Sequence, residues 1–261
     1  MTPEEWIRAH VEVTGEVERV RARPWSVVLR APTASGDVYL KQNGPGFEHE
    51  VPLLEVLAPL APDLLPRLVA TDAERRWVLM EDAGVEGSPR WRELVVAYAQ
   101  LQRATVAHVD ALVAAGVPDR RLAVLPEVYT RATGRSPRVV EELCAELETL
   151  GLPEAIEHDD LHLTNILLRD AEQRIVDWGD ACVSHPFLSF GVTRRFLDDD
   201  DVDAYLEQWG QPDRLRSAIP AAMRLAGIPR AVTALGFGAR EFATYWLDRV
   251  DVSPDEWDER Y

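Results

Sequence analysis

The segment HDDLHLTNILLRDAEQRIVDWGD, residues 158–180, decides the fold and the chemistry of this chain. It contains the pattern H-x-D-x-x-x-x-N at His158, Asp160 and Asn165, followed by a β-hairpin pattern whose second strand ends at Asp177. A loop leading into the hairpin can present Asp160 and Asn165 to one pocket, and the second strand returns Asp177 to the same place. Amide and carboxylate oxygens from Asn165 and Asp177 suit Mg²⁺, which binds a few protein oxygens together with substrate phosphates. Asp160 is then available to accept a proton from an attacking hydroxyl group.

The same residues allow other interpretations when each is taken alone. Asp160 and Asn165 belong to residue types that commonly cap turns, and an isolated histidine such as His158 is more often a hydrogen-bonded structural residue. His158 and His162 also have the i, i+4 spacing of a zinc pair on a helix. The run from His162 into a hairpin disfavours a helix there. The combined pattern therefore favours the Mg²⁺ and proton-acceptor interpretation over zinc.

Outside this segment, the predicted secondary structure changes from strands to helices along the chain. Runs rich in strand-forming residues, separated by turns, occupy most of the first 80 or so residues, together with a capped helix starting at Thr2. A Leu-rich helix among them is expected to begin a residue or two before Pro52, because proline breaks a helix interior. Beyond the strands the pattern becomes helical, with a long helix predicted from Ser88-Pro89 to a stop near Gly116.

These patterns predict an α+β protein with three regions. Residues 1–80 form a β-rich N-terminal lobe, and the short Gly-containing segment 81–87 is a hinge. Residues 88–261 form a larger, mainly helical C-terminal lobe that is interrupted by the hairpin of the opening segment.

Composition excludes several classes of protein. The formal net charge of −17 argues against binding nucleic acid phosphates and is permissive for a cationic partner. No apolar run approaches the roughly 20 residues needed to span a bilayer, and the polar, acidic start lacks the features of a signal peptide. Two cysteines do not make a disulfide framework. We therefore expect a soluble, cytoplasmic protein that binds neither nucleic acid nor membrane; the oligomeric state stays open.

The motifs of the opening segment resemble those of the aminoglycoside phosphotransferase-like family of small-molecule kinases, within the kinase-like fold. That family has a catalytic loop similar to HGDLHxxN and a metal motif with an aromatic residue or Leu before Gly, and this chain has HDDLHLTN and DWGD. The departure is Asp159, which stands where Gly is usual. The resemblance spans nearly the whole chain. It implies a bilobal protein-kinase-like fold, in which the first lobe binds the nucleotide and the second holds the catalytic loop and the acceptor site. It also implies ATP and Mg²⁺ as cofactors, Asp160 and His158 as catalytic-loop residues, and Asn165 and Asp177 as metal ligands.

Lys41 is the one lysine among the 28 lysine and arginine residues, and it lies near the end of the third predicted strand. The family places a lysine there that contacts the α- and β-phosphates of ATP. A compact ammonium group fits between phosphate oxygens and a glutamate, whereas a planar guanidinium does not occupy the same space. The resemblance implies that this glutamate lies on the next helix. Glu50 is the better match and Glu48 is its rival.

The remaining nucleotide contacts are carried over from the family by position. The hinge implies backbone contacts to adenine at Glu81 and Ala83, with Met80 facing the pocket. The first hairpin contains no glycine, so a Gly-rich phosphate loop is absent, and Ser26 or the backbone of its neighbours is the substitute. Arg19, Arg21 and Arg23 alternate along a strand, which favours the solvent-facing side.

The resemblance leaves the acceptor open, because the family's acceptors include aminoglycosides, macrolides, choline, homoserine and sugars. Acidic residues in the helical lobe favour a cationic, aminoglycoside-like acceptor, with Asp180 and Glu241 as candidate contacts. Trp209, Tyr245 and Trp246 could form a cation or sugar platform, although core packing is the more common role of such residues. We expect a kinase that phosphorylates a hydroxyl group of a small molecule, with antibiotic resistance as one possible biological role. A non-catalytic, nucleotide-binding regulatory member is the alternative, and a metal-dependent hydrolase is a distant third.

Overall fold

The computed structural model describes residues 1–257 and consists of two compact units. The first contains Met1–Pro89 together with Leu163–Gly179, and the second contains Arg90–His162 and the chain from Asp180 onward. The first break lies close to the end of the predicted hinge. The hairpin of the opening segment, which the sequence placed within the helical lobe, groups with the β-rich unit instead.

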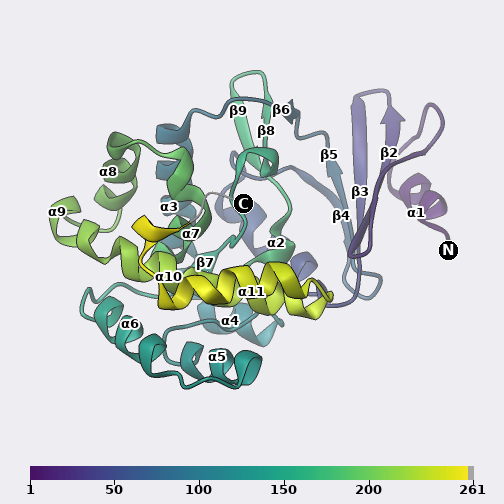
Figure 1. Ribbon diagram of the computed structural model, residues 1–261. Helices are drawn as coiled ribbons and strands as arrows, with labels where there is room; N and C mark the ends of the chain where they lie inside the picture. The colour runs from purple at the N-terminus through teal and green to yellow at the C-terminus, as the bar shows by residue number, and fades with distance from the viewer. Residues whose placement is uncertain (258–261) are drawn as a thin grey trace. The chain divides into compact units, whose positions relative to one another are not determined.

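The first unit is built on a five-stranded antiparallel sheet with strand order β1-β2-β3-β5-β4 (Figure 1). The strands predicted from the sequence are confirmed. Their bounds are Glu18–Arg23 for β1, Ser26–Thr33 for β2, Gly36–Asn43 for β3, Leu68–Asp72 for β4 and Trp77–Glu81 for β5.

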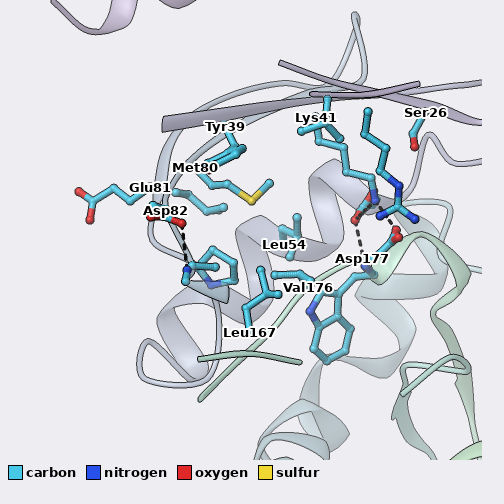
Figure 2. A pocket seen from close by; sticks show the side chains of 18 residues that line it. Ser26, Tyr39, Lys41, Leu54, Met80, Glu81, Asp82, Leu167, Val176 and Asp177 are labelled. Atoms are coloured by element: carbon cyan, nitrogen blue, oxygen red, sulfur yellow. Dashed lines mark hydrogen bonds and ion pairs between the residues drawn. The ribbon is translucent and has the colours of Figure 1, made fainter. Parts of the chain in front are cut away.

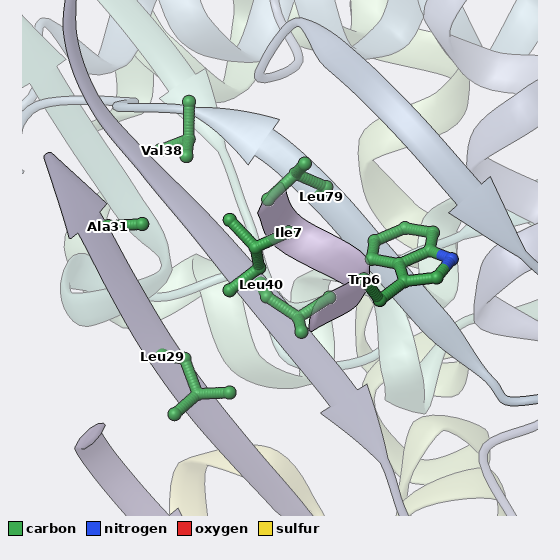
Figure 3. Close-up of a cluster of buried hydrophobic side chains, with 7 residues drawn as sticks. All are labelled: Trp6, Ile7, Leu29, Ala31, Val38, Leu40 and Leu79. Atoms are coloured by element: carbon green, nitrogen blue, oxygen red, sulfur yellow. The ribbon is translucent and has the colours of Figure 1, made fainter. Parts of the chain in front are cut away.

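One face of this sheet is covered by helix α1, Pro3–His10, which begins with the predicted capping box between Thr2 and Glu5. Trp6 and Ile7 of α1 are buried against the apolar side chains of the central strands, as Figure 3 shows for Leu29, Ala31, Val38, Leu40 and Leu79. Because side chains alternate between the two faces of a strand, the next residues along β3 and β5 point to the opposite face. That face carries Tyr39, Lys41 and Met80.

The opposite face is lined by helix α2, Glu50–Leu60, which begins two residues before Pro52 as predicted. A second sheet, with order β6-β8-β9, belongs to the same unit. It pairs Val85–Glu86 (β6) with Ile166–Arg169 (β8), which is followed by Glu172–Ile175 (β9).

The approach of β6 to β8 explains why the hairpin joins the first unit. A Cβ atom at Gly84 would lie 2.1 Å from the carbonyl oxygen of Leu168, so only glycine permits this pairing. The N–H of Ile175 also donates a hydrogen bond to the carbonyl of Leu64 at 2.8 Å. The segment 81–87 is therefore partly a strand rather than an unstructured linker.

The second unit is mainly helical and contains a two-stranded antiparallel sheet of β7, Ala155–Glu157, and β10, Cys182–Ser184. Helix α10 packs against α6, α7 and α11. The helices are α3 Trp91–Thr105, α4 Val109–Ala114, α5 Leu125–Thr133, α6 Arg138–Glu148, α7 Phe190–Thr193, α8 Asp199–Glu207, α9 Pro212–Leu215, α10 Ile219–Gly236 and α11 Arg240–Asp248.

The predicted long helix from Ser88-Pro89 to Gly116 is interrupted in the structure. A 3₁₀ turn at Val106–His108 separates α3 from α4. The hydroxyl of Thr105 donates to the carbonyl of Gln102 and accepts from the N–H of Ile156. Such side-chain bonds to the backbone compete with the helical pattern, and here they tie the end of α3 to β7.

Two further expectations concern composition. Cys144 and Cys182 are both buried free thiols. None of the helices in the described part of the chain has both the length and the apolar character that a membrane span requires.

Candidate active site

A pocket within the first unit brings together every residue that the sequence predicted to bind the nucleotide (Figure 2). Its predicted members are Ser26, Lys41, Glu50, Met80, Glu81, Ala83 and Asp177. In Figure 2, Tyr39, Met80 and Leu54 lie on one side, with Leu167 and Val176 of the hairpin segment below them. Lys41, Ser26 and Asp177 lie at the other end. The pocket therefore has an apolar part, suited to a flat ring, and a charged part.

Lys41 is the centre of the charged end. Its Nζ lies 2.7 Å from Oε2 of Glu50 and 2.6 Å from Oδ1 of Asp177, and the lysine is 8% exposed. Burial alone would lower the pKa of Lys41, but the charges of Asp177 and Glu50 outweigh it, so the pKa is raised and the ammonium group stays charged. Burial raises the pKa of the Glu50 carboxyl, and the neighbouring Lys41 opposes that shift.

The choice between Glu50 and Glu48 as the partner of Lys41 is decided by geometry. Glu50 also accepts a hydrogen bond from the N–H of Trp178 at 2.9 Å, which ties α2 to the end of the hairpin. Glu48 instead lies 3.4 Å from Arg76 and accepts from the N–H of Gly46. The structure therefore pairs Lys41 with Glu50, as favoured from the sequence.

Asp177 reaches Lys41 from a left-handed backbone conformation, with φ of 65°. Aspartate is one of the few residue types other than glycine that adopt this region readily. The N–H of the preceding Val176 donates to the carbonyl of Asn165 at 2.9 Å, so the two predicted metal ligands lie at the same end of the hairpin. Asn165 is buried there, immediately before β8.

Several backbone N–H groups of residues 81–84 donate hydrogen bonds to other residues of the first unit. Glu81 donates to the carbonyl of Arg67 at 2.9 Å, and Asp82 donates to the carbonyl of Asp37 at 3.1 Å. Gly84 donates to the side chain of Asp82.

Asp160 lies in the second unit and is held by two basic side chains. Its Oδ1 lies 2.8 Å from Nη2 of Arg230 on α10, and its Oδ2 lies 3.2 Å from Nε2 of His162. Burial would raise the pKa of the Asp160 carboxyl, but the hydrogen bond of His162 and the charge of Arg230 lower it well below its ordinary value. Asp160 is therefore an ionised carboxylate with defined hydrogen bonds on both oxygens.

His158 supports the loop that carries Asp160. Its ring is fully buried, and its Nδ1 accepts the N–H of Asp160 at 3.3 Å. The backbone N–H of His158 donates to the hydroxyl of Tyr98 at 2.9 Å. These contacts give His158 a positioning role.

Asp159, the departure from the family motif, has a φ of 62°. Gly is usual at this position because the left-handed conformation suits it, and aspartate is among the residues that tolerate the same conformation. The Asp159 carboxyl is buried, and within residues 1–257 its Oδ2 has no hydrogen-bond partner. Burial raises its pKa well above the ordinary value, although Arg230 opposes that shift. Its carbonyl accepts a hydrogen bond from Arg230.

Of the two residues predicted to contact the acceptor, Asp180 and Glu241, the structure places one near Asp160. Asp180 interacts electrostatically with Asp159 and Arg230, so it belongs to the Asp160 cluster. Glu241 is exposed in the first turn of α11, and no contact in the described part of the chain links it to Asp160.

Two of the aromatic residues considered for a platform, Tyr245 and Trp246, contact arginine side chains of the protein itself. The guanidinium carbon of Arg230 lies 4.7 Å from the ring centroid of Trp246, and that of Arg249 lies 3.5 Å from the centroid of Tyr245. Trp246 is buried, in line with the core-packing interpretation. Arg230 was not found from the sequence, because it lies 70 residues from Asp160 and belongs to no motif.

Comparison with known proteins identifies the class. Residues 21–225 match the model of the phosphotransferase enzyme family, so the chain belongs to that family. A comparison of the sequence with curated proteins finds no match.

Solved structures of low sequence identity show the same fold. A choline/ethanolamine kinase family protein from Mesorhizobium loti has a TM-score of 0.65 and 18% identity, over 95% of this chain and 93% of that chain. A macrolide 2'-phosphotransferase type I has a TM-score of 0.62 and 14% identity, over 96% and 98%. Aminoglycoside 2'-phosphotransferase-IIIa, solved as a GDP complex, has a TM-score of 0.62 and 13% identity, over 96% and 98%. The chain therefore has the protein-kinase-like fold of these small-molecule phosphotransferases.

Proposed function

We propose that this protein is an ATP- and Mg²⁺-dependent kinase that transfers the γ-phosphoryl group of the nucleotide to a hydroxyl group of a small molecule. The observation that carries the proposal is the buried ion-pair group of Lys41 with Glu50 and Asp177 at the charged end of the pocket. A lysine paired with a helix glutamate and a metal-binding aspartate is the arrangement that positions phosphates in this class of enzyme.

The two parts of the pocket suit the two parts of a nucleotide. The base would lie against Met80. It would accept a hydrogen bond from the N–H of Ala83 and donate one to the carbonyl of Glu81. The phosphates would lie near Lys41 and Ser26 at the charged end. In this proposal residues 1–80 and the hinge at 81–87 provide the nucleotide site together with the hairpin segment 163–179, and the rest of residues 88–261 provides the catalytic loop and the acceptor site.

The residues at the end of the hairpin fit a magnesium ion. Asn165 and Asp177 supply an amide and a carboxylate oxygen, the donor types that Mg²⁺ prefers, and the backbone bond from Val176 holds them at one end of the hairpin. The bound metal would neutralise charge on the phosphate oxygens. Asp177 would then hold the metal while it also pairs with Lys41.

Asp160 is the proposed proton acceptor for the acceptor hydroxyl. In the transfer, the acceptor oxygen forms a bond to the γ-phosphorus, the bond from that phosphorus to the leaving oxygen of the diphosphate breaks, and the hydroxyl proton passes to Asp160. The hydrogen bonds of Arg230 and His162 fix the orientation of the carboxylate. His158 holds the loop through the N–H of Asp160.

We propose a cationic, aminoglycoside-like acceptor as the first candidate. The net charge of −17 and the position of Asp180 beside Asp159 support it. Structures of similar fold include enzymes named for aminoglycosides, macrolides, choline and ethanolamine, so metabolite acceptors are the alternative. Antibiotic resistance is the biological role that an aminoglycoside or macrolide acceptor would imply.

The test is a product assay with ATP or GTP, Mg²⁺ and a panel of aminoglycosides, macrolides, choline, ethanolamine, homoserine and sugars. We expect one class of acceptor to stimulate release of nucleoside diphosphate and to gain the mass of one phosphoryl group. Nucleotide binding without any phosphorylated product across the panel would favour the non-catalytic, regulatory alternative. Absence of nucleotide binding would contradict both.

A further inference from the structure

Strand β1 contains an irregularity that changes which face its arginines occupy. Along the β1–β2 pairing, Arg19 is opposite Leu29 and Arg21 is opposite Val28, so Val20 is an additional residue on β1. A β-bulge of this kind reverses the alternation of faces beyond it. Arg19, Arg21 and Arg23 are all exposed, as the sequence pattern indicated, but Arg19 and Arg21 do not lie on the same face of the strand.

The bulge directs Arg21 to the nucleotide pocket. Val28 is paired with Lys41 on β3, so Arg21, Val28 and Lys41 form one row across three strands. All three line the pocket. Arg19 is opposite Leu29, which belongs to the core beneath α1 on the other face.

The hairpin that carries Arg21 is anchored near this pocket. The N–H of Gly44, just after β3, donates to the carbonyl of Trp25 in the β1–β2 turn at 2.7 Å. A Cβ atom at Gly44 would lie 2.9 Å from that carbonyl oxygen, so the close approach requires glycine. The turn is therefore tied to β3 rather than built as a flexible glycine-rich loop.

Arg21 is the cation that lines the pocket besides Lys41. Four carboxylates line it, from Glu50, Glu81, Asp82 and Asp177, against two cations. Lys41 is already matched by two of these carboxylates. The side chain of Arg21 makes no hydrogen bond or ion pair with any residue that the structure describes, so its guanidinium group can serve a ligand.

We propose that Arg21 binds the β- and γ-phosphates of the nucleotide and so replaces the backbone amides of the missing glycine-rich loop. The proposal rests on the proposed function of this pocket. A guanidinium group presents paired N–H donors that match phosphate oxygens, and it remains charged at every working pH. Arg21 would thus be a phosphate-binding residue that the family motifs do not indicate.

The test compares Arg21→Ala with Arg19→Ala, which removes the same side chain from the opposite face of the same strand. Affinities for adenosine, ADP and ATP with Mg²⁺ are measured by calorimetry on the full chain. We expect Arg21→Ala to weaken ATP binding about tenfold or more, which is the scale of a charge-assisted hydrogen bond. Adenosine affinity should stay unchanged, and Arg19→Ala should match the wild type for all three ligands. Arg21→Lys should recover part of the loss.

The outcomes separate the two proposals. Equal ATP affinity in the wild type, Arg21→Ala and Arg19→Ala would overturn the role of Arg21 and leave the kinase proposal standing. An equal loss for adenosine and ATP in Arg21→Ala would show a structural effect and would also overturn it. A wild-type protein that binds none of the three ligands would contradict the kinase proposal itself, and the role of Arg21 with it.

Discussion

Each unit of this protein contains a cluster of charged side chains, and the two clusters have opposite arrangements of charge. In the first unit a single cation, Lys41, is bound by the two carboxylates Glu50 and Asp177. In the second unit a single carboxylate, Asp160, is held by the two basic side chains of Arg230 and His162. One cluster carries an excess of negative charge, and the other surrounds a carboxylate with hydrogen-bond donors.

Under the proposed function, the two clusters would serve two different tasks of phosphoryl transfer. A lysine between two carboxylates has a fixed position and stays charged, but the cluster needs further positive charge before it attracts phosphate. Mg²⁺ and Arg21 are the proposed sources of that charge. A carboxylate between two donors stays ionised and oriented, so its position contributes more than its basicity, as expected when catalysis depends on positioning.

The largest expected effect comes from the second cluster. Asp160→Asn keeps the shape of the side chain but removes the proton acceptor and a negative charge. Turnover should fall by roughly 10²–10⁴-fold, the usual value of general-base catalysis, while binding of ATP with Mg²⁺ persists. Steady-state kinetics and calorimetry measure the two quantities.

Asp170→Asn, an exposed change in the turn between β8 and β9, is the matched control. Near-normal turnover in Asp160→Asn would remove Asp160 from the mechanism.

In the first cluster, Lys41→Arg keeps the charge and changes the shape. The planar head cannot occupy the site between Glu50 and Asp177 without displacing one of them. A displacement of about an ångström can reduce turnover roughly 10²-fold, because transfer depends on positioning. Glu50→Gln should cause a similar loss, and Glu48→Gln, whose side chain lies near Arg76, should cause little. An active Lys41→Arg enzyme would mean that the single lysine is an accident of composition.

The smallest expected effect is a change in pH dependence. Arg230 lowers the pKa of Asp160, so Arg230→Gln should raise that pKa toward its ordinary value. The protonated fraction of Asp160 then increases at acidic pH, and the acid limb of the kcat/KM profile moves to higher pH. Activity at alkaline pH should change less. Arg214→Gln on α9 is the exposed control; a uniform loss with an unmoved acid limb would reduce Arg230 to a structural role.

Local sequence patterns predicted much of the fold and the cluster of Lys41, Glu50 and Asp177. The strands, the capping box at Thr2 and the start of α2 before Pro52 depend on short-range preferences, and all agree with the structure. The preference for Glu50 over Glu48 also followed from its position ahead of a Leu-rich helix. Lys41 was recognisable because it is the chain's one lysine.

The features that could not be predicted depend on contacts between distant parts of the chain. The β1 bulge that turns Arg21 toward the pocket is a property of the pairing with β2, since the sequence alternates without interruption. Arg230 meets Asp160 across 70 residues of chain. The break after α3 depends on the bond between Thr105 and Ile156. In each case tertiary structure overrides the local signal.

The most direct test of the account is the metal dependence of nucleotide binding, measured by thermal unfolding of the wild type and of Asp177→Ala. ATP with Mg²⁺ should raise the melting temperature of the wild type, because a ligand at 100 times its Kd stabilises the folded state by about 2.7 kcal/mol. In Asp177→Ala the stabilisation by ATP should no longer depend on Mg²⁺. If neither ATP nor GTP changes the melting temperature of the wild type at any concentration of Mg²⁺, the assignment of this pocket to a nucleotide is wrong.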